Sequence, residues 1–163
     1  MIRKILDSDL KDILNIQSKV YSKNLLESPE SIISKVRVSS DTCFVHVTNE
    51  KINSYCLTYP YPKLTSPPLN NILKEITLSQ NIFLHDLSVT PEFNGNGIAR
   101  KMISKLFEIC SSQNFNSITL IAVQNSETFW QKFGFKIIKS KNISSSYGVD
   151  SKLMLCDNIP NKG

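Results

Sequence analysis

The feature that most constrains the fold is a run of strand, glycine turn, helix and strand in the second half of the sequence. An apolar stretch at residues 82–89 leads into a turn with two glycines, and a helix is predicted over residues 98–111. The apolar residues of that helix recur at helical spacing: Ile98, Met102, Ile103, Leu106, Phe107 and Cys110. A further β-rich stretch follows at residues 117–123. Two strands joined by a helix predict a sheet with a parallel pair, which excludes an all-β or all-helical fold.

The rest of the chain adds strands and helices to this unit. Strands are predicted at residues 2–6, 42–47, 52–59, 133–139 and 152–156, and helices after Ser8 or Asp9, after Ser28 and at residues 127–131. Residues 60–80 carry four prolines, which exclude an uninterrupted helix or a central strand there. A connection of this length is typical of functional loops. The order of elements predicts an α/β (α+β) fold, with a mixed central sheet of about six to seven strands and helices on both faces.

Composition narrows the class of protein. At 163 residues, with 40% apolar and 20% charged residues, the chain fits one globular domain over residues 1–163. No stretch approaches the roughly 18 apolar residues of a membrane helix, and early charges exclude a signal peptide, so we expect a cytoplasmic protein without membrane contact. The net charge of +5 comes with scattered lysines, which favours a solvated surface over a nucleic-acid site. The four distant cysteines predict buried free thiols and no metal site.

The turn before the predicted helix has the composition of an anion-binding loop. Gly95 and Gly97 let backbone N–H groups face a ligand, because no Cβ stands in the way. The helix that begins directly afterwards adds N–H donors and the positive end of its dipole. The alternative is a plain glycine turn. A nucleotide P-loop is excluded because no Gly-Lys-Ser/Thr follows, and the dinucleotide motif G-x-G-x-x-G fails at Arg100.

Two segments resemble the GNAT N-acetyltransferase superfamily. Residues 94–99, Asn-Gly-Asn-Gly-Ile-Ala, resemble its acetyl-CoA motif Q/R-x-x-G-x-G/A, although Asn94 stands where the family has Arg or Gln. Residues 125–135 resemble its second segment, a short helix with an aromatic end followed by Gly-Phe. The resemblance implies the GNAT fold, with a splay between the strands at residues 84–89 and 118–123 that admits the pantetheine arm of acetyl-CoA. The cofactor-binding residues implied are Leu87, Ser88, Val89, Asn94, Gly95, Asn96, Gly97, Ile98, Ala99, Arg100, Asn125, Phe129 and Trp130.

The same resemblance indicates where catalysis takes place. Residues 84–89 and 129–135 are similar to the arylalkylamine N-acetyltransferase branch, which has a functional histidine at the position of His85. His85 is predicted to be the general base or to anchor a water relay, and the alternative is a histidine that only bonds a backbone carbonyl. Asp86 is the second candidate, and would otherwise orient a loop or bind a substrate ammonium. Strand alternation predicts that these two side chains point to opposite faces.

At the position where the family often has a proton donor for the leaving thiolate, this chain has no obvious candidate. Trp130 stands where GNAT enzymes often have a tyrosine, and an indole N–H can donate a hydrogen bond but is no proton source. Tyr147 is the predicted replacement. Solvent protonation would also suffice, since a thiolate of pKa near ~8.5 is a tolerable leaving group.

Aromatic residues beside the long loop are candidates for contact with the acceptor. Tyr59 and Tyr61 flank Pro60, and together with Ser-Pro-Pro-Leu at residues 66–69 they resemble uncharacterised bacterial GNAT proteins with a His-Pro-Trp and Ser-Pro-Pro pair. We predict that both tyrosines bind the acceptor, against the alternative of core packing. The predicted function is an acetyl-CoA-dependent N-acetyltransferase for a primary amine of a small molecule, as a monomer or homodimer. The alternatives are a protein N-terminal or lysine acetyltransferase and a non-catalytic acyl-CoA sensor.

Overall fold

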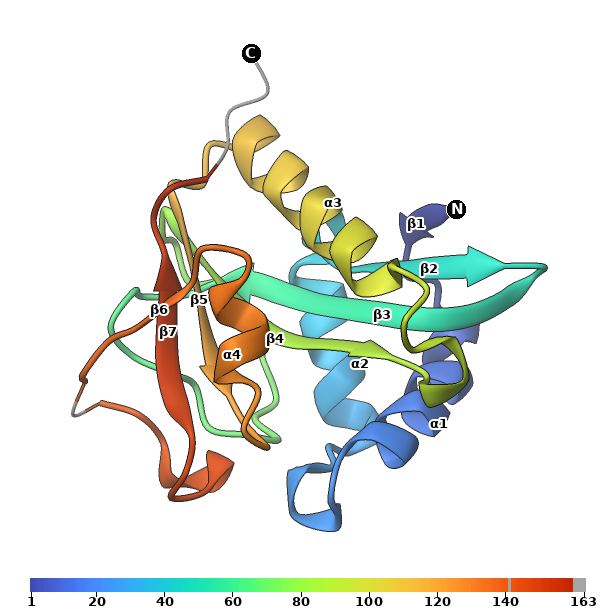
Figure 1. The fold of residues 1–163 in the computed structure, drawn as a ribbon, viewed down its shortest axis with the longest axis horizontal. Helices are drawn as coiled ribbons and strands as arrows, with labels where there is room; N and C mark the ends of the chain where they lie inside the picture. The colour runs from blue at the N-terminus through green and yellow to red at the C-terminus, as the bar shows by residue number, and fades with distance from the viewer. Residues whose placement is uncertain (141, 160–163) are drawn as a thin grey trace.

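The computed structural model describes residues 1–140 and 142–159, which form a seven-stranded mixed sheet with four α-helices (Figure 1). The strands are β1 (Ile2–Lys4), β2 (Phe44–Thr48), β3 (Lys51–Pro60), β4 (Asn81–Val89), β5 (Ser117–Ala122), β6 (Lys136–Ile137) and β7 (Lys152–Cys156). The helices are α1 (Leu10–Val20), α2 (Pro29–Val38), α3 (Ile98–Ser112) and α4 (Glu127–Gln131). The strand order is β1-β2-β3-β4-β5-β7-β6, and β4 and β5 are the parallel pair between antiparallel neighbours.

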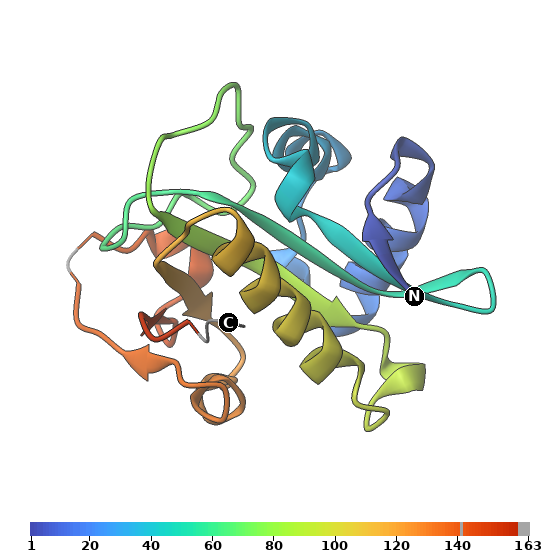
Figure 2. The same ribbon diagram turned by 90° about the horizontal axis from the view of Figure 1, so that it is seen from above.

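Helices cover both faces of the sheet, which confirms the predicted layering (Figure 2). α3 and α4 bury one core around Leu84 and Leu106. α1 and α2 bury a second core on the opposite face, around Ile13, Ile32 and Leu57. Each helix contributes one apolar stripe, and the strands supply residues to both cores because their side chains alternate. In the described part of the chain, no helix is both long and apolar enough to span a membrane.

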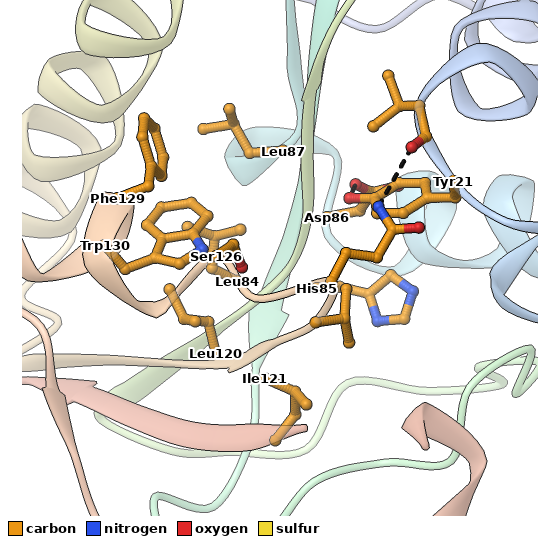
Figure 3. A pocket seen from close by; sticks show the side chains of 13 residues that line it. Tyr21, Leu84, His85, Asp86, Leu87, Leu120, Ile121, Ser126, Phe129 and Trp130 are labelled. Carbon is orange, nitrogen blue, oxygen red and sulfur yellow. Dashed lines mark hydrogen bonds between the residues drawn. The ribbon is translucent and has the colours of Figure 1, made fainter. Parts of the chain in front are cut away.

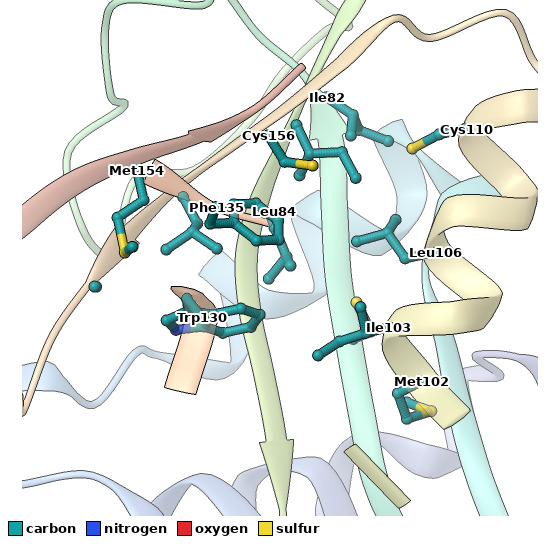
Figure 4. Close-up of a cluster of buried hydrophobic side chains, with 14 of the residues drawn as sticks. Ile82, Leu84, Met102, Ile103, Leu106, Cys110, Trp130, Phe135, Met154 and Cys156 are labelled. Atoms are coloured by element: carbon teal, nitrogen blue, oxygen red, sulfur yellow. The ribbon is translucent and has the colours of Figure 1, made fainter. Parts of the chain in front are cut away.

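α3 seats the glycine turn against the sheet. Its buried residues are Ile98, Met102, Ile103, Leu106 and Cys110, as their helical spacing predicted. Figure 4 shows Met102, Ile103, Leu106 and Cys110 on the side of α3 that faces Ile82 and Leu84 of β4, with Trp130 of α4 in the same cluster. The N-terminus of α3, which begins directly after the glycine turn, is therefore held in a fixed position near the end of β4.

The pairing between β4 and β5 ends before the strands do. Register pairs run only as far as Leu84 and Leu120, whereas β4 continues to Val89 and β5 to Ala122. On its other edge, β4 stays paired with β3 up to Val89. In the described part of the chain, the edge of β4 that faces β5 therefore has no strand partner beyond Leu84. This is the splay that the family resemblance implied.

A bulge in β4 changes the direction of two predicted catalytic side chains. Two consecutive residues of β3 pair with Asp86 and with Leu84, so His85 is an extra residue in β4. His85 and Asp86 both contact residues of the α1–α2 face. Leu84 and Leu87, in contrast, both join the core under α3. The predicted alternation to opposite faces is wrong, because the bulge adds a residue without advancing the pairing.

The loop over residues 61–80 contains no helix or strand, as its prolines predicted. Hydrogen bonds fasten it to the α2 region, among them Asn70 N–H to Glu27 Oε2 at 2.7 Å, Lys35 Nζ to Asn71 O at 2.8 Å, and Leu73 N–H to Ser34 Oγ at 3.0 Å. Leu69 of the same loop lines a cavity together with His85 and Asp86. The loop therefore forms part of the wall around the residues that the sequence marked as catalytic.

The strands predicted at residues 2–6, 42–47 and 133–139 have different bounds in the structure, and the last differs most. The strand predicted at residues 133–139 is reduced to β6, because the Phe133 and Gly134 N–H groups bond back to carbonyls of α4 at 3.0 and 3.2 Å. The first helix begins at Leu10, directly after Asp9 as one of the two predicted starts requires, and a 3₁₀ turn at Asp7–Asp9 precedes it. The predicted start of α2 is confirmed, since the Ser31 N–H donates to the capping hydroxyl of Ser28 at 3.2 Å.

The packing of α3 yields a stability prediction. Leu106 is fully buried, so Leu106→Ala should lower the free energy of unfolding by about 2–5 kcal/mol through lost contacts and a residual cavity. Lys101→Ala, on the exposed face of the same helix, should change it by less than about 0.5 kcal/mol. Urea denaturation followed by circular dichroism measures both. Equal effects of the two substitutions would contradict the role given to α3.

Candidate functional site

The unpaired edge of β4 borders a cavity of about 200 Å³, which we call the wedge (Figure 3). It is lined by residues of β4, β5, α4 and the end of α1: Val20, Tyr21, Leu84, His85, Asp86, Leu87, Leu120, Ile121, Val123, Gln124, Ser126, Phe129 and Trp130. Figure 3 shows Leu87 and Trp130 on one side of β4, with His85 and Asp86 on the other. The wedge can therefore receive an extended chain on the α4 side whose end reaches His85 and Asp86.

The glycine turn is open to a ligand. Gly95 and Gly97 have φ of 84° and 74°, in the left-handed region that favours glycine. A Cβ at either position would meet no atom within 4 Å, so the space beside the turn is free of protein. The N-terminal bond of α3 joins the Lys101 N–H to the Gly97 carbonyl at 3.2 Å, and the N–H groups of residues 98–100 precede it. These donors and the helix dipole suit an anion such as a pyrophosphate.

Side chains around the turn supply charge and anchorage. The Arg100 guanidinium lies 5.2 Å from the centre of the Phe133 ring, which holds a cation beside the start of α3. Glu92 ties the turn to α1 by accepting a hydrogen bond from Lys19 Nζ at 2.8 Å. This bond, together with one from the Thr90 hydroxyl, lowers the pKa of Glu92 to about 2. Asn94 is exposed, so the departure from the family motif leaves anion binding to backbone donors and Arg100.

His85 is held by a carboxylate from the segment before α2. Its Nε2 lies 2.5 Å from Glu27 Oε1, and the two side chains are only 1% and 3% exposed. Because a carboxylate accepts hydrogen bonds, this contact keeps the proton of the neutral ring on Nε2. The basic nitrogen is then Nδ1, which lies 3.4 Å from the Tyr59 hydroxyl.

Glu27 is also the centre of a buried charge cluster. Its Oε2 accepts hydrogen bonds from the Asn70 N–H at 2.7 Å, the Ser31 hydroxyl at 3.1 Å and Lys35 Nζ at 3.3 Å. Burial alone would raise the pKa of Glu27, but His85, Lys35 and the Asn70 N–H outweigh burial and lower it to about 2. Burial lowers the pKa of Lys35, and Glu27 opposes that shift. The cluster thus keeps a carboxylate ionised behind His85.

Asp86 forms a second polar cluster on the same face. It accepts hydrogen bonds from the hydroxyls of Tyr21 at 2.5 Å, Tyr55 at 2.6 Å and Ser88 at 2.9 Å. Burial raises the pKa of Asp86, and these donors oppose the shift. Burial and the neighbouring carboxylate raise the pKa of both tyrosines. With three donors already engaged, Asp86 is better placed to orient Tyr21 than to remove a proton.

Trp130 packs in the core and borders the wedge. It is 8% exposed, and its ring contacts those of Phe129 and Phe135, with centroids 5.0 and 5.5 Å away. No buried polar side-chain atom in the described residues lacks a hydrogen-bond partner. The indole N–H, which makes no hydrogen bond within that part of the chain, is therefore accessible from the wedge. Both interpretations made for Trp130, core packing and contact with a ligand, fit this position.

The three tyrosines predicted as site residues, Tyr59, Tyr61 and Tyr147, do not line the wedge. The Tyr147 hydroxyl donates to the Pro67 carbonyl at 2.8 Å, and the residue lines a cavity on the far side of His85. Tyr59 is 1% exposed and packs edge-on against Tyr61, with ring centroids 6.2 Å apart. Core packing therefore accounts for Tyr59, and Tyr147 is not positioned at the α4 side of the wedge.

Residues beyond β5 bridge the wedge. Gln124 Nε2 donates to the Val20 carbonyl at 3.2 Å, the dashed bond in Figure 3, and Gln124 Oε1 accepts from the Ser22 N–H at 3.0 Å. Gln124 and Asn125 both have left-handed backbone conformations, with φ of 53° and 58°. Asn125, predicted to bind the cofactor, lies in this turn and does not line the wedge.

Sequence reasoning missed the residues that surround His85 and Asp86. Glu27 lies 58 positions before His85, and Tyr21 lies 65 before Asp86. Glu27 carried one usable signal, an acidic residue directly before a capped helix, but that position is equally usual for a solvated surface. Lys35 looked like an ordinary exposed lysine of an amphipathic helix, and the structure buries it completely.

Comparison with known proteins gives one family. A profile of the acetyltransferase (GNAT) family matches residues 10–135, which include α1, the wedge, the glycine turn and α4. No match was found among curated protein sequences.

Solved structures show where the fold recurs. The loading GNATL domain of CurA from Lyngbya majuscula has a TM-score of 0.80 and 14% identity over 96% of each chain. The ribosomal-protein-S18-alanine N-acetyltransferase from Escherichia coli has a TM-score of 0.71 and 14% identity, over 100% of this chain and 96% of that one. The PaiA N-acetyltransferase from Thermoplasma acidophilum, in complex with coenzyme A, has a TM-score of 0.70 and 13% identity over 96% and 98%. At these identities the likeness concerns the fold alone.

The glycine turn yields a binding prediction. Gly97→Ala should cost about 1–2 kcal/mol of stability through its left-handed backbone. It should also weaken coenzyme A binding about tenfold, because the added Cβ would enter the open space beside the turn and keep the phosphate about one charge-assisted hydrogen bond short of its backbone donors. Gly134→Ala is the matched control, because its φ is +90° and its added Cβ meets only Cys156 Sγ at 3.8 Å. Calorimetric titration with coenzyme A should find Gly134→Ala unchanged. Equal loss of affinity in both variants would refute the cradle.

The Glu27 cluster yields a stability prediction with a defined sign. Glu27→Gln leaves the Lys35 cation buried without its carboxylate and should lower the free energy of unfolding by about 3–5 kcal/mol. The double variant Glu27→Gln/Lys35→Met removes both charges and should recover part of that loss.

The pKa of Glu27 is lowered from 4.5 to about 2, so its contribution to stability is present above pH 4.5 and is lost as the pH falls toward 2. Urea denaturation across this range should show a decline in the wild type that Glu27→Gln lacks. Parallel pH profiles for the two proteins would contradict the cluster.

Proposed function

We propose that this chain, which belongs to the acetyltransferase (GNAT) family, transfers the acetyl group of acetyl-coenzyme A directly to a primary amine of a small molecule. The observation that carries the proposal is the wedge, where an open strand edge borders a carboxylate-bound histidine, with the glycine turn following the same strand, β4. Neither the glycine turn nor the histidine alone would indicate this chemistry. Together they provide one site for an anionic carrier and an adjacent site for proton removal.

The residues that would hold the carrier are arranged in sequence along one path. The donors at Gly97 and residues 98–100 would bind the pyrophosphate, with the Arg100 charge beside them. The free edge of β4 at Leu87 would hydrogen-bond the pantetheine amides as an added strand does. Trp130 and Phe129 would cover the arm from α4. When bound, acetyl-CoA supplies an acetyl thioester, and this path ends beside His85.

His85 would serve as the base. The amine nitrogen forms the new C–N bond while the C–S bond breaks, and the proton lost by the amine must be accepted nearby. Glu27 holds the proton of the neutral ring on Nε2, so Nδ1, which faces the Tyr59 hydroxyl at 3.4 Å, is the nitrogen that would accept a proton. Because the His85 side chain is only 1% exposed, a water molecule would carry the proton to it. A backbone N–H of β4, at Leu87 or a neighbour, would polarise the thioester carbonyl.

The leaving thiolate would be protonated by solvent. The Tyr147 hydroxyl is engaged by the Pro67 carbonyl on the far side of His85, and burial raises the pKa of Tyr147, which makes it a poor donor to the wedge. The accessible indole N–H of Trp130 would instead hydrogen-bond the sulfur, without transferring its proton. This assignment explains how the chain could act without a tyrosine at position 130.

Turnover tests the proposal. Acetyl-CoA with a panel of primary amines should release free thiol, and His85→Gln should lower kcat about 100-fold or more, as expected when a general base is lost, with unchanged binding of coenzyme A. The chain has a second histidine, His46, which bonds Asn53 away from the wedge, so His46→Gln should keep kcat near that of the wild type.

Two results would count against this proposal. An unchanged kcat in His85→Gln would remove the base assignment. Binding of acetyl-CoA without thiol release from any amine would favour a non-catalytic acyl-CoA sensor, the function that Trp130 and Asn94, which both depart from the family pattern, would suit.

A further inference from the structure

A second cavity meets the wedge at His85 and Asp86. We call it the acceptor pocket; its lining is Tyr21, Leu25, Glu27, Leu69, His85, Asp86, Ile121, Val123 and Tyr147. Five of these residues also line the wedge: Tyr21, His85, Asp86, Ile121 and Val123. The two cavities therefore touch along the His85–Asp86 segment. A molecule in the acceptor pocket would reach the end of the wedge from the side opposite α4.

A wider hollow, the vestibule, continues from the acceptor pocket toward solvent. It is formed by Ser22, Asn24 and Leu25 after α1, residues 123–125 after β5 and residues 145–151 before β7. Leu25, Val123 and Tyr147 line both spaces. In Figure 1 the connection after α1 and the turn before β7 lie at the same end of the molecule, which agrees with a shared opening. The route from solvent to His85 thus runs through the vestibule and then the acceptor pocket.

The size of the acceptor pocket limits what can pass to His85. Its volume is about 40 Å³, against about 480 Å³ for the vestibule. One water molecule needs roughly 10–15 Å³ of such space, so the pocket holds about three atoms of a linear chain. Its walls are mainly apolar, from Leu25, Leu69 and Ile121. An unbranched aminoalkyl end fits this pocket, and a carbon with a branch next to the amine does not.

Acidic side chains line the route, and the buried Lys35 Nζ lies behind it, 3.3 Å from Glu27 Oε2. The acceptor pocket carries the carboxylates of Glu27 and Asp86, and the vestibule carries that of Asp150. No lysine or arginine lines either space in the described residues, although the whole chain has a net charge of +5. A route lined by carboxylates in a protein of positive net charge favours a cationic ligand. Glu27 is already paired with Lys35 and His85, whereas Asp86 and Asp150 form no ion pair in the described residues. These two carboxylates, one at each end of the route, match a molecule with an amine at each end.

We propose that the acceptor is an unbranched aliphatic diamine, with one amine in the acceptor pocket and the second ammonium in the vestibule near Asp150. The inference rests on the proposed acetyl transfer and names its substrate class. The inner amine loses a proton to the His85 relay and forms the C–N bond, while the C–S bond breaks and the thiolate takes a proton from water. The product has one charge fewer, so its attraction to the carboxylates weakens and it leaves. A peptide N-terminus is disfavoured because its amine carbon is branched.

Kinetics with matched amines test the proposal in the intact protein. Butane-1,4-diamine should have a kcat/KM three- to fivefold above that of n-butylamine, about the worth of one solvent-exposed ion pair. The kcat/KM for the branched sec-butylamine should be about tenfold or more below that for n-butylamine. Asp150→Asn should raise KM for the diamine until its kcat/KM equals that of n-butylamine. The kcat/KM for n-butylamine should stay unchanged. Asp12→Asn, an exposed change on α1 away from both spaces, should alter neither.

Several results would overturn the inference. These are a diamine no better than n-butylamine, an Asp150→Asn variant with wild-type selectivity, sec-butylamine used as well as n-butylamine, or a lysine-containing peptide preferred over the diamine. Each of them shows turnover and so leaves the proposed acetyl transfer standing. Absence of thiol release with every amine would overturn the proposed function and this inference with it.

Discussion

The structure depends on the early end of the hydrogen bonding between β4 and β5. Their parallel pairing stops at Leu84 and Leu120, while β3 keeps β4 extended as far as Val89 on the other edge. An exposed strand edge carries backbone donors and acceptors that must find partners in water or in a ligand. The protein keeps the edge open by packing α3 under β4 and inserting the aromatic rings of α4 beside it. The wedge, the position of the glycine turn and the access to His85 all follow from this.

A second constraint is the cost of burying the charged groups around His85. Burying Glu27, Lys35 and Asp86 is costly, and each is tolerated because it has several hydrogen-bond partners. These partners come from the end of α1, α2, β3, β4 and the loop at residues 61–80, so the polar groups join segments that lie far apart in the sequence. The bulge at His85 directs two neighbouring side chains into this cluster. The two carboxylates have different hydrogen-bond partners and therefore different roles. Glu27 orients His85, and Asp86 orients Tyr21.

The sequence predicted those parts of the fold that local patterns determine. The strand, glycine turn and helix at residues 82–111 could be predicted because spacing, left-handed glycines and helix start signals all act within a few residues. The bulge could not, since its register depends on how β3 pairs. The Glu27 contact to His85 spans 58 positions and depends on a loop whose path the prolines restrict but do not set. The hydrogen bond from the Tyr147 hydroxyl to the Pro67 carbonyl could not be predicted either, because it depends on two loops meeting.

The most direct test of the central claim is amide hydrogen exchange with and without acetyl-CoA. If the open edge of β4 and the glycine turn hold the carrier, exchange should slow at residues 87–89 and 95–100. Exchange should stay unchanged at residues 44–48 of β2, which lie outside the site. Protection confined to the expected segments would support binding in the wedge. Stabilisation by acetyl-CoA without protection at residues 87–89 would contradict it, because the carrier would then bind elsewhere on the protein.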